Sequence, residues 1–233
     1  MDTDVVRPPR AGRAAAACWI AAGVVYVVSE AVAAAAFPGY SYATNYISDL
    51  GIPQVETSGG RAIDSPLHLV MNTGFVLSGV FFVAAALLAV PVLGSAHRRT
   101  FLALAVTHGI GIVLVGVVNS GQANVDNGIG ALHGIGAAMA IVGGNLTVIV
   151  AGLAARRSAD LRRLGAAFMA LGVVGLLGTI ALVLDSGSTA VDVLPDGVWE
   201  RLAVYTVTAF ELLVGTTTLV RLRRRGTTTA PDA

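Results

Sequence analysis

The sequence lacks the charge that a water-soluble protein of its size would carry. Only 12% of its 233 residues are Asp, Glu, Lys or Arg, and 55% are hydrophobic, with a mean hydropathy of +0.76. Soluble domains carry roughly 25% charged residues. A chain with so few charges cannot cover its apolar side chains in water, so the composition predicts a protein whose solvent is a lipid bilayer.

Lysine is absent and cysteine occurs once, as Cys18, while all 15 basic residues are arginine. A single cysteine excludes a disulfide framework and a thiolate metal site within one chain. The sequence also has no phosphate-binding loop, no dinucleotide-binding glycine pattern, no His-Glu-x-x-His motif and no basic face for nucleic acid. We therefore expect no cofactor, no metal ion and no nucleic-acid partner.

Six apolar runs are long enough to cross a hydrocarbon core of about 30 Å as helices. They occupy residues 14–37, 67–93, 101–118, 131–154, 164–184 and 199–220. The first run is too long for the apolar region of a signal peptide, so we expect it to be retained. The predicted fold is all-α, a polytopic membrane protein with six transmembrane helices in a compact bundle. The tails, residues 1–13 and 223–233, are predicted to be disordered.

The distribution of arginine predicts the orientation of the chain in the membrane. Thirteen of the 15 arginines lie in the two tails and in the segments that follow the second and fourth runs, and only Arg61 and Arg201 lie in the alternate segments. Cytoplasmic loops carry the excess of positive charge. We therefore expect a multi-pass protein of the plasma membrane with both termini in the cytoplasm and the loop of residues 38–66 outside.

The longest polar interval runs from Tyr40 to Asn72 and reads YSYATNYISDLGIPQVETSGGRAIDSPLHLVMN. Long loops in compact structures are usually functional or disordered. The tyrosines and aliphatic residues of this interval argue against disorder. The interval is therefore predicted to form the functional face of the protein.

Polar side chains at the outward ends of the helices are candidates for a site, because such groups are costly in a membrane. The candidate catalytic residues are His68 and His133, with Asp49 as an orienting group. The candidate ligand-binding residues are Glu30, Asn45, Ser48, Asn72, Glu200 and Arg201. Deeper in the membrane, the helix rise places His108 and Glu211 at similar depths, which permits a hydrogen bond or a proton relay between them.

Each of these residues also has a simpler structural interpretation. Asp49 can cap a short helix, Glu200 and Arg201 can form a surface pair at a helix start, and His68 and His133 can be interfacial. Asn145 can bridge two helices. Ser65, His68 and Asp49 contain the elements of a nucleophile, a base and an orienting group, but such triplets arise by chance in many polar loops.

Four segments resemble one family of bacterial and archaeal membrane proteins. They are YSYATNYISDLG, DSPLHLVMNTGFVLSG, LHGIGAAMAIVGGN and WERLAVYTVTAFE. They are similar to the family known as domain of unknown function nine-ninety-eight, and the ISDLG region is distantly similar to the Frag–DRAM–Sfk membrane proteins, some of which are tied to lipid remodelling. The resemblance implies six spans and polar family positions at Asn45, Ser48, Asp49, His68, Asn72, His133, Asn145, Glu200 and Arg201.

Three functions remain open at this point. The protein binds or modifies a lipid or small amphiphile in an outward pocket, with His68 or His133 as general base, Asp49 orienting it, and Glu200 and Arg201 clamping an anionic head group. Alternatively, it is a small proton-coupled transporter with His108 and Glu211 as the relay, or a non-catalytic assembly partner. The expected partners are membrane lipid and a lipid-like or small-molecule ligand.

Overall fold

The computed structural model describes residues 9–89, 95–186 and 193–227, and six long helices dominate these residues. The long helices are α1 (Pro9–Ala36), α2 (His68–Ala89), α3 (Ser95–Val117), α5 (Gly130–Ala155), α6 (Arg162–Ser186) and α7 (Asp196–Thr227). All six are long and apolar enough to cross a membrane. The prediction of an all-α, six-span protein is confirmed.

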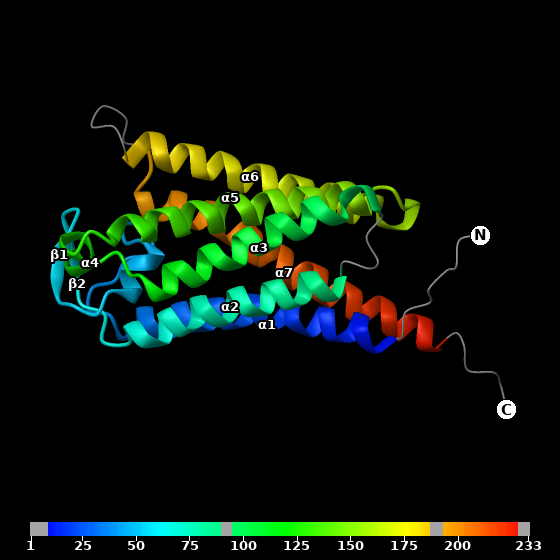
Figure 1. Cartoon of the computed structure of the whole chain (residues 1–233), viewed down its shortest axis with the longest axis horizontal. Helices are drawn as coiled ribbons and strands as arrows, with labels where there is room; N and C mark the ends of the chain where they lie inside the picture. The colour runs from blue at the N-terminus through cyan, green and yellow to red at the C-terminus, as the bar shows by residue number, and fades with distance from the viewer. Residues whose placement is uncertain (1–8, 90–94, 187–192, 228–233) are drawn as a thin grey trace.

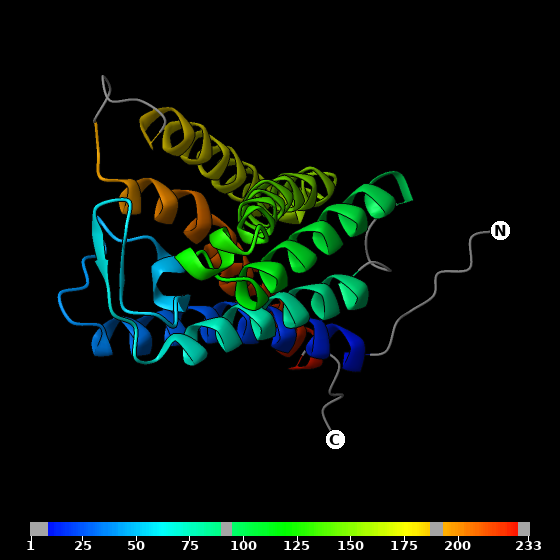
Figure 2. The same ribbon diagram turned by 60° about the vertical axis from the view of Figure 1, so that its left-hand side comes forward.

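The six helices form a ring in chain order (Figures 1 and 2). Each long helix packs against the next, α7 closes the ring by packing against α1, and α5 also touches α7. Because α5 and α7 touch each other, α6 packs against both of them from the outer side of the ring. The interior of the bundle is therefore formed by α1, α2, α3, α5 and α7.

The two ends of the bundle differ. The start of α1 and the end of α7 lie at one end, together with the end of α2, the start of α3 and the connection from α5 to α6; we call this the termini end (Figure 1). At the opposite end, residues 37–67 connect α1 to α2 and cover the bundle; we call these residues the roof, and this end the roof end.

The roof contains a short 3-10 helix and a hairpin. The 3-10 helix η1 (Ile47–Gly51) is followed by β1 (Glu56–Ser58) and β2 (Arg61–Ile63), which pair antiparallel. Gly59 and Gly60 join the strands with φ of 53° and 78°. A two-residue hairpin turn with positive φ at both positions favours glycine. The short helix α4 (Gln122–Asp126) lies beside the hairpin, where the backbone N–H of Gln122 donates to the Glu56 carboxylate.

Apolar side chains fix the roof to the bundle. Ile47, Leu50, Ile52 and Ile63 are each at most 1% exposed, and they join a core cluster that includes Phe75 of α2. Burial of one such side chain contributes about 1.5–3 kcal/mol. The roof is therefore part of the hydrophobic core of the protein.

A second core cluster occupies the termini half of the bundle. Trp19 of α1 packs edge-to-face against Phe82 of α2 and Phe210 of α7, with ring centroids 4.7 and 5.3 Å apart. Edge-to-face pairs of this kind add to the stabilisation that burial itself provides. These rings fill the centre of the bundle on the side of the termini.

At the termini end of the bundle, several helices extend beyond their predicted boundaries. α1 begins at Pro9 and α7 ends at Thr227, so the predicted disorder is wrong for residues 9–13 and 223–227, and α3 begins at Ser95 rather than at residue 101. Arginine is a good helix former, so a helix continues past the apolar segment that crosses the lipid. The tail residues 1–8 and 228–233, and the end of the second predicted span (90–93), lie outside the described residues.

Close helix packing at Gly111 generates a prediction. A Cβ atom at Gly111 of α3 would lie 2.5 Å from the backbone nitrogen of Ala140 and 2.6 Å from the carbonyl oxygen of Gly136 on α5, whereas a Cβ at Gly134 would meet nothing within 4 Å. Gly111→Ala should therefore force the two helices apart and lower the melting temperature in detergent. Gly134→Ala is the matched control and should gain up to about 1 kcal/mol of helix propensity. Equal melting temperatures for both variants would contradict the close contact.

Candidate functional site

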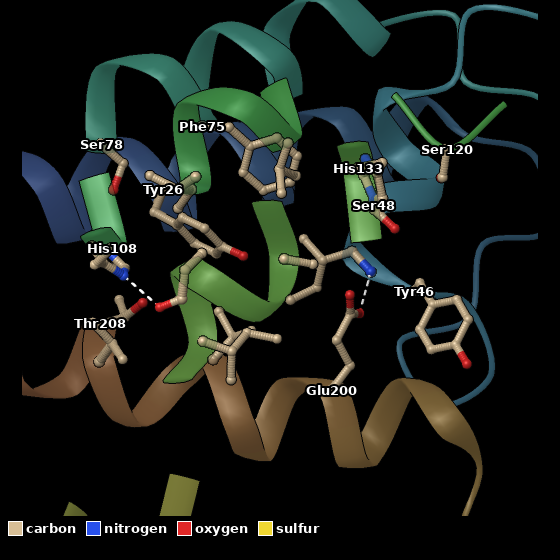
Figure 3. A pocket seen from close by; sticks show the side chains of 18 of the residues that line it. Tyr26, Tyr46, Ser48, Phe75, Ser78, His108, Ser120, His133, Glu200 and Thr208 are labelled. Atoms are coloured by element: carbon tan, nitrogen blue, oxygen red, sulfur yellow. Dashed lines mark hydrogen bonds between the residues drawn. The ribbon is translucent and has the colours of Figure 1, made fainter. Parts of the chain in front are cut away.

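A cavity of about 360 Å³ lies within the roof end of the bundle (Figure 3). Residues of the roof and of α1, α2, α3, α5 and α7 line it, and none of α6 does. Pockets that bind small molecules have volumes of roughly 300–1,000 Å³, so the cavity is of ligand size. Its polar side chains gather at two levels, which we call the mouth, beneath the roof, and the floor, deeper in the bundle.

The mouth offers several polar groups that the protein itself leaves free. Its polar residues are Tyr46, Ser48, Ser58, Arg61, Ser120, His133 and Glu200. The hydroxyls of Ser48, Ser58 and Ser120 make no hydrogen bond with any described residue. A polar group of a ligand would find hydroxyl donors and acceptors here.

Backbone groups hold the side chains of His133 and Glu200 at the mouth. Glu200 of α7 accepts a hydrogen bond of 2.5 Å from the backbone N–H of Ile47, which ties the roof to α7 (Figure 3). Nδ1 of His133 lies 2.7 Å from the carbonyl oxygen of Val118. Because a carbonyl only accepts, Nδ1 carries the proton and Nε2 of the neutral ring is an acceptor. The mouth therefore presents a carboxyl group and an imidazole in fixed orientations.

Between the mouth and the floor, the cavity wall is mostly apolar, and its polar atom is the hydroxyl oxygen of Tyr26 (Figure 3). The rings of Tyr26 and Phe75 pack edge-to-face with centroids 5.7 Å apart, and Ile112, Val115 and Val204 complete this part of the wall. We call these five residues the apolar belt. A hydrocarbon segment is the chemical complement of such a wall.

The floor carries four polar side chains: Ser78, His108, Thr208 and Glu211 (three of them labelled in Figure 3). Nδ1 of His108 donates to the carbonyl oxygen of Ala140 at 2.6 Å, and its Nε2 has no partner among the described residues. Glu211 is 2% exposed. The direct His108–Glu211 hydrogen bond that equal depth permitted is thus absent, although both residues line the same floor.

Asp49 organises the roof rather than the cavity. Its carboxylate accepts from Nε of Arg61 at 2.8 Å, from the Asn45 amide at 3.1 Å and from the backbone N–H of Tyr46 at 3.1 Å. This agrees with the simpler interpretation of Asp49 as a cap of a short helix. Asp49 contacts neither His68 nor His133 and does not line the cavity.

The charges of the roof reinforce one another. Burial lowers the pKa of Arg61, but the hydrogen bond and the negative charge of Asp49, together with the charges of Tyr46 and Asp196, leave that pKa raised. Burial raises the pKa of Tyr46, and the hydrogen bond that its hydroxyl donates to Asp196 at 2.6 Å raises it further. The Arg61 guanidinium also lies over the Tyr46 ring, 4.4 Å from its centroid. The side of the mouth is thereby fixed to the start of α7.

Arg201 is the centre of a second network. Its guanidinium contacts Glu30 at 3.0 Å, the Tyr40 hydroxyl at 2.6 Å, and the carbonyl oxygens of Tyr42 at 2.6 Å and Asn45 at 2.8 Å. The Arg201 and Glu30 side chains are 8% and 3% exposed. Neither lines the cavity. Arg201 thus uses its donors on Glu30 and on the roof, away from the cavity. The roles of Arg201 as a head-group clamp and of Glu30 as a ligand-binding residue stay predictions.

The predicted catalytic group is not assembled. Nδ1 of His68 bonds the carbonyl oxygen of Ser65, and the Ser65 hydroxyl donates to the carbonyl oxygen of Leu50. Asn72 donates to the carbonyl oxygen of Gly51 at 2.9 Å, while its Oδ1 has no partner among the described residues. His68, Asn72 and Asn45 do not line the cavity. Of the predicted mouth residues, Ser48, His133 and Glu200 are the ones that the structure brings together.

Several lining residues escaped the sequence analysis. Tyr26, Ser78 and Thr208 lie within apolar runs, and serine and threonine are common in membrane helices because their hydroxyls bond to the preceding turn. Only the cavity distinguishes Ser78 and Thr208 from such residues. Asp185, near the end of α6, accepts a hydrogen bond of 2.6 Å from Nε1 of Trp199 and does not line the cavity. Among the described residues, no three His, Cys, Asp or Glu side chains form a group that could hold a metal ion.

Six helices long and apolar enough to cross a membrane, five of which line a roofed, ligand-sized cavity, define a multi-pass membrane protein with an internal candidate site. The chain belongs to the family described as protein of unknown function (DUF998), whose model matches residues 20–217. No protein of curated function and no solved structure matches the chain. The distant similarity to the Frag–DRAM–Sfk proteins stays a prediction.

The Arg201–Glu30 pair yields a stability prediction. Removing one partner of a buried ion pair typically costs about 3–5 kcal/mol, because the other charge is left unpaired. Arg201→Met should therefore lower the melting temperature in detergent strongly, and Arg201→Met combined with Glu30→Gln should recover part of the loss. The four proteins of this cycle are compared by thermal unfolding followed by size-exclusion chromatography. A double variant no more stable than Arg201→Met would show that the two side chains act independently.

Proposed function

We propose that the protein binds a lipid-like or other small amphiphilic molecule in the cavity beneath the roof. The observation that carries the proposal is the division of the cavity wall into a polar mouth, an apolar belt and a polar floor within about 360 Å³. A hydrocarbon segment would lie along the belt, where Tyr26, Phe75 and Val204 exclude water. A polar group of the same molecule would lie at the mouth beside Ser48, His133 and Glu200.

Binding fits the mouth better than hydrolysis does. A nucleophilic mechanism needs a hydroxyl or thiol within hydrogen-bond reach of a base. At the mouth, Nδ1 of His133 bonds a backbone carbonyl, and no serine hydroxyl donates to His133 or Glu200 among the described residues. The two side chains are therefore assigned to recognition of the ligand.

Binding also fits the bundle better than transport does. The cavity lining ends at the level of Glu211 and His108, and the rings of Trp19, Phe82 and Phe210 pack against one another in the termini half. A transport path would have to continue through these packed rings. The arrangement favours a site that is closed on the side of the termini.

We place the roof outside the cell and both termini in the cytoplasm, in the plasma membrane. Described arginines concentrate at the termini end, where Arg98 and Arg99 lie near the start of α3 and Arg156 and Arg157 lie just after the end of α5. At the roof end, Arg61 and Arg201 are both paired with carboxylates. An excess of arginine thus marks the termini end, which supports a cytoplasmic location for that end.

The orientation is tested by labelling single cysteines. In a Cys18→Ser background, Val55→Cys in the exposed roof should react with a membrane-impermeant maleimide in intact cells. Ser158→Cys, exposed between α5 and α6, should react only after permeabilisation. The reverse pattern would place the roof in the cytoplasm and overturn the orientation.

The binding proposal is tested with a diazirine-bearing decanol as a photoreactive probe in lipid nanodiscs. Peptide mapping should find the label on the cavity faces of α3, α5 and α7. Ala137→Trp fills the cavity wall and should reduce this labelling about tenfold or more, since the belt then has no room for the chain. Ala138→Trp, at the neighbouring exposed position on α5, should leave it unchanged.

Thermal unfolding of both variants shows whether each is folded, so that loss of labelling is not confused with loss of structure. Labelling that is spread evenly over lipid-facing helix surfaces, and that responds equally to Ala137→Trp and Ala138→Trp, would reject a ligand site in the cavity.

A further inference from the structure

We infer that the floor of the cavity, formed by Ser78, His108, Thr208 and Glu211, binds a protonated amine at the buried end of the ligand. The inference rests on the proposed function, since it names the chemical class of the molecule that the cavity takes. The ligand is then an amphiphile with an ammonium group at one end, a hydrocarbon segment along the belt and its other end at the mouth.

Glu211 is the floor residue whose carboxyl group would be stabilised by a positively charged partner. It lies near the middle of α7, its side chain is 2% exposed, and it makes no hydrogen bond or ion pair with any described residue. A carboxyl group at this depth in a membrane needs a hydrogen-bond partner, a cation or a proton. Its side chain lines the cavity, so a ligand in the cavity can supply that partner.

The two hydroxyls of the floor differ from other threonine hydroxyls in the long helices. Thr147, Thr179 and Thr217 each donate to the carbonyl oxygen four residues earlier, at 2.5 to 2.8 Å. Ser78 and Thr208 are 1% and 6% exposed and make no hydrogen bond with any described residue. Buried hydroxyls are rarely left without a partner, and these two line the cavity beside Glu211.

Together, the polar groups of the floor favour a ligand group that donates hydrogen bonds. The hydroxyls of Ser78 and Thr208 and the carboxyl oxygens of Glu211 all accept hydrogen bonds, and the donation of Nδ1 to Ala140 leaves His108 with only an acceptor nitrogen. No arginine lies among the described floor residues. Arg61 lines the cavity at the mouth, where it is paired with Asp49. An alkylammonium group is charged, carries N–H donors and accepts nothing, so it matches this set.

Two further features favour an ammonium over a bare metal ion. The floor has one carboxyl group and one imidazole, and no group of three such side chains that could hold a metal is found among the described residues. Above it stand the rings of Tyr26 and Phe75. Aromatic rings stabilise organic cations that have been withdrawn from water, so the belt accommodates both the alkyl chain and the charge on its way to the floor.

The test compares decylamine with decanol as competitors of the photoreactive decanol probe, on the full chain in lipid nanodiscs. The two competitors share a chain and differ in the terminal group. Decylamine should compete at about tenfold lower concentration or less, as expected for a hydrogen bond to a charged group. Glu211→Gln should bring the two competitors to within about twofold of each other. Comparing their ratio in the two proteins cancels their different partitioning into lipid.

Matched threonine variants separate the floor from the rest of α7. Thr208→Val should reduce the preference for decylamine, and Thr216→Val, at an exposed position two turns further along, should not. Unchanged decanol competition in Glu211→Gln shows that this variant is folded.

Equal competition by decylamine and decanol in the unchanged protein would overturn the amine inference. The binding proposal would remain in place, since the photoreactive decanol still binds. A parallel loss of both competitors in Glu211→Gln would also overturn it, because Glu211 would then support the structure rather than the charge. Absence of any cavity labelling by the probe would instead reject the proposed function itself.

Discussion

The buried ion pair between Arg201 and Glu30 is the interaction on which the candidate site depends. A guanidinium and a carboxylate withdrawn from water are costly unless every hydrogen-bonding group is satisfied. Arg201 meets this requirement by donating to Glu30, to the Tyr40 hydroxyl and to backbone carbonyls of the roof. The need to satisfy one arginine therefore fixes the roof on α7, and the fixed roof, together with the Asp49–Arg61 pair and the Glu200–Ile47 bond, gives the cavity its mouth.

Elsewhere in the interior, a buried polar side chain that joins two helices has hydrogen-bond partners for its polar atoms. Asn145 is fully buried, and its amide donates to the carbonyl oxygens of Ile141 and Ala203 while its oxygen accepts from the Thr206 hydroxyl. It therefore bridges α5 and α7, as the simpler interpretation predicted. Against this background, the hydroxyls of Ser78 and Thr208 and the carboxyl of Glu211 stand out, because all three lack partners among the described residues and line one cavity.

Hydropathy predicted the six spans because lipid imposes a minimum length on any crossing helix. It could not locate the helix ends, since arginine continues a helix beyond the lipid, as at Pro9 and Ser95. Depth along a helix predicted that Glu200, His133, His108 and Glu211 would matter, but depth carries no information on the direction of a side chain. Glu30 and Arg201 share a level with Glu200, yet they pair with each other and do not line the cavity, whereas Glu200 lines it. That distinction depends on which helices are neighbours, which the ring of helices decides and the sequence does not display.

The order of mouth, apolar belt and floor along the cavity has an energetic consequence for a ligand. A neutral chain end passing the mouth gains from burial against Phe75, Ile112 and Val204, whereas a charged end loses its hydration along the same belt. An ammonium group recovers that cost only if it reaches the carboxyl of Glu211, which lies beyond the belt. A short amine would leave its charge among apolar side chains, and a long neutral molecule would leave the floor groups unpaired. In the proposed binding mode, the spacing of mouth and floor therefore selects for chain length and end-group charge together.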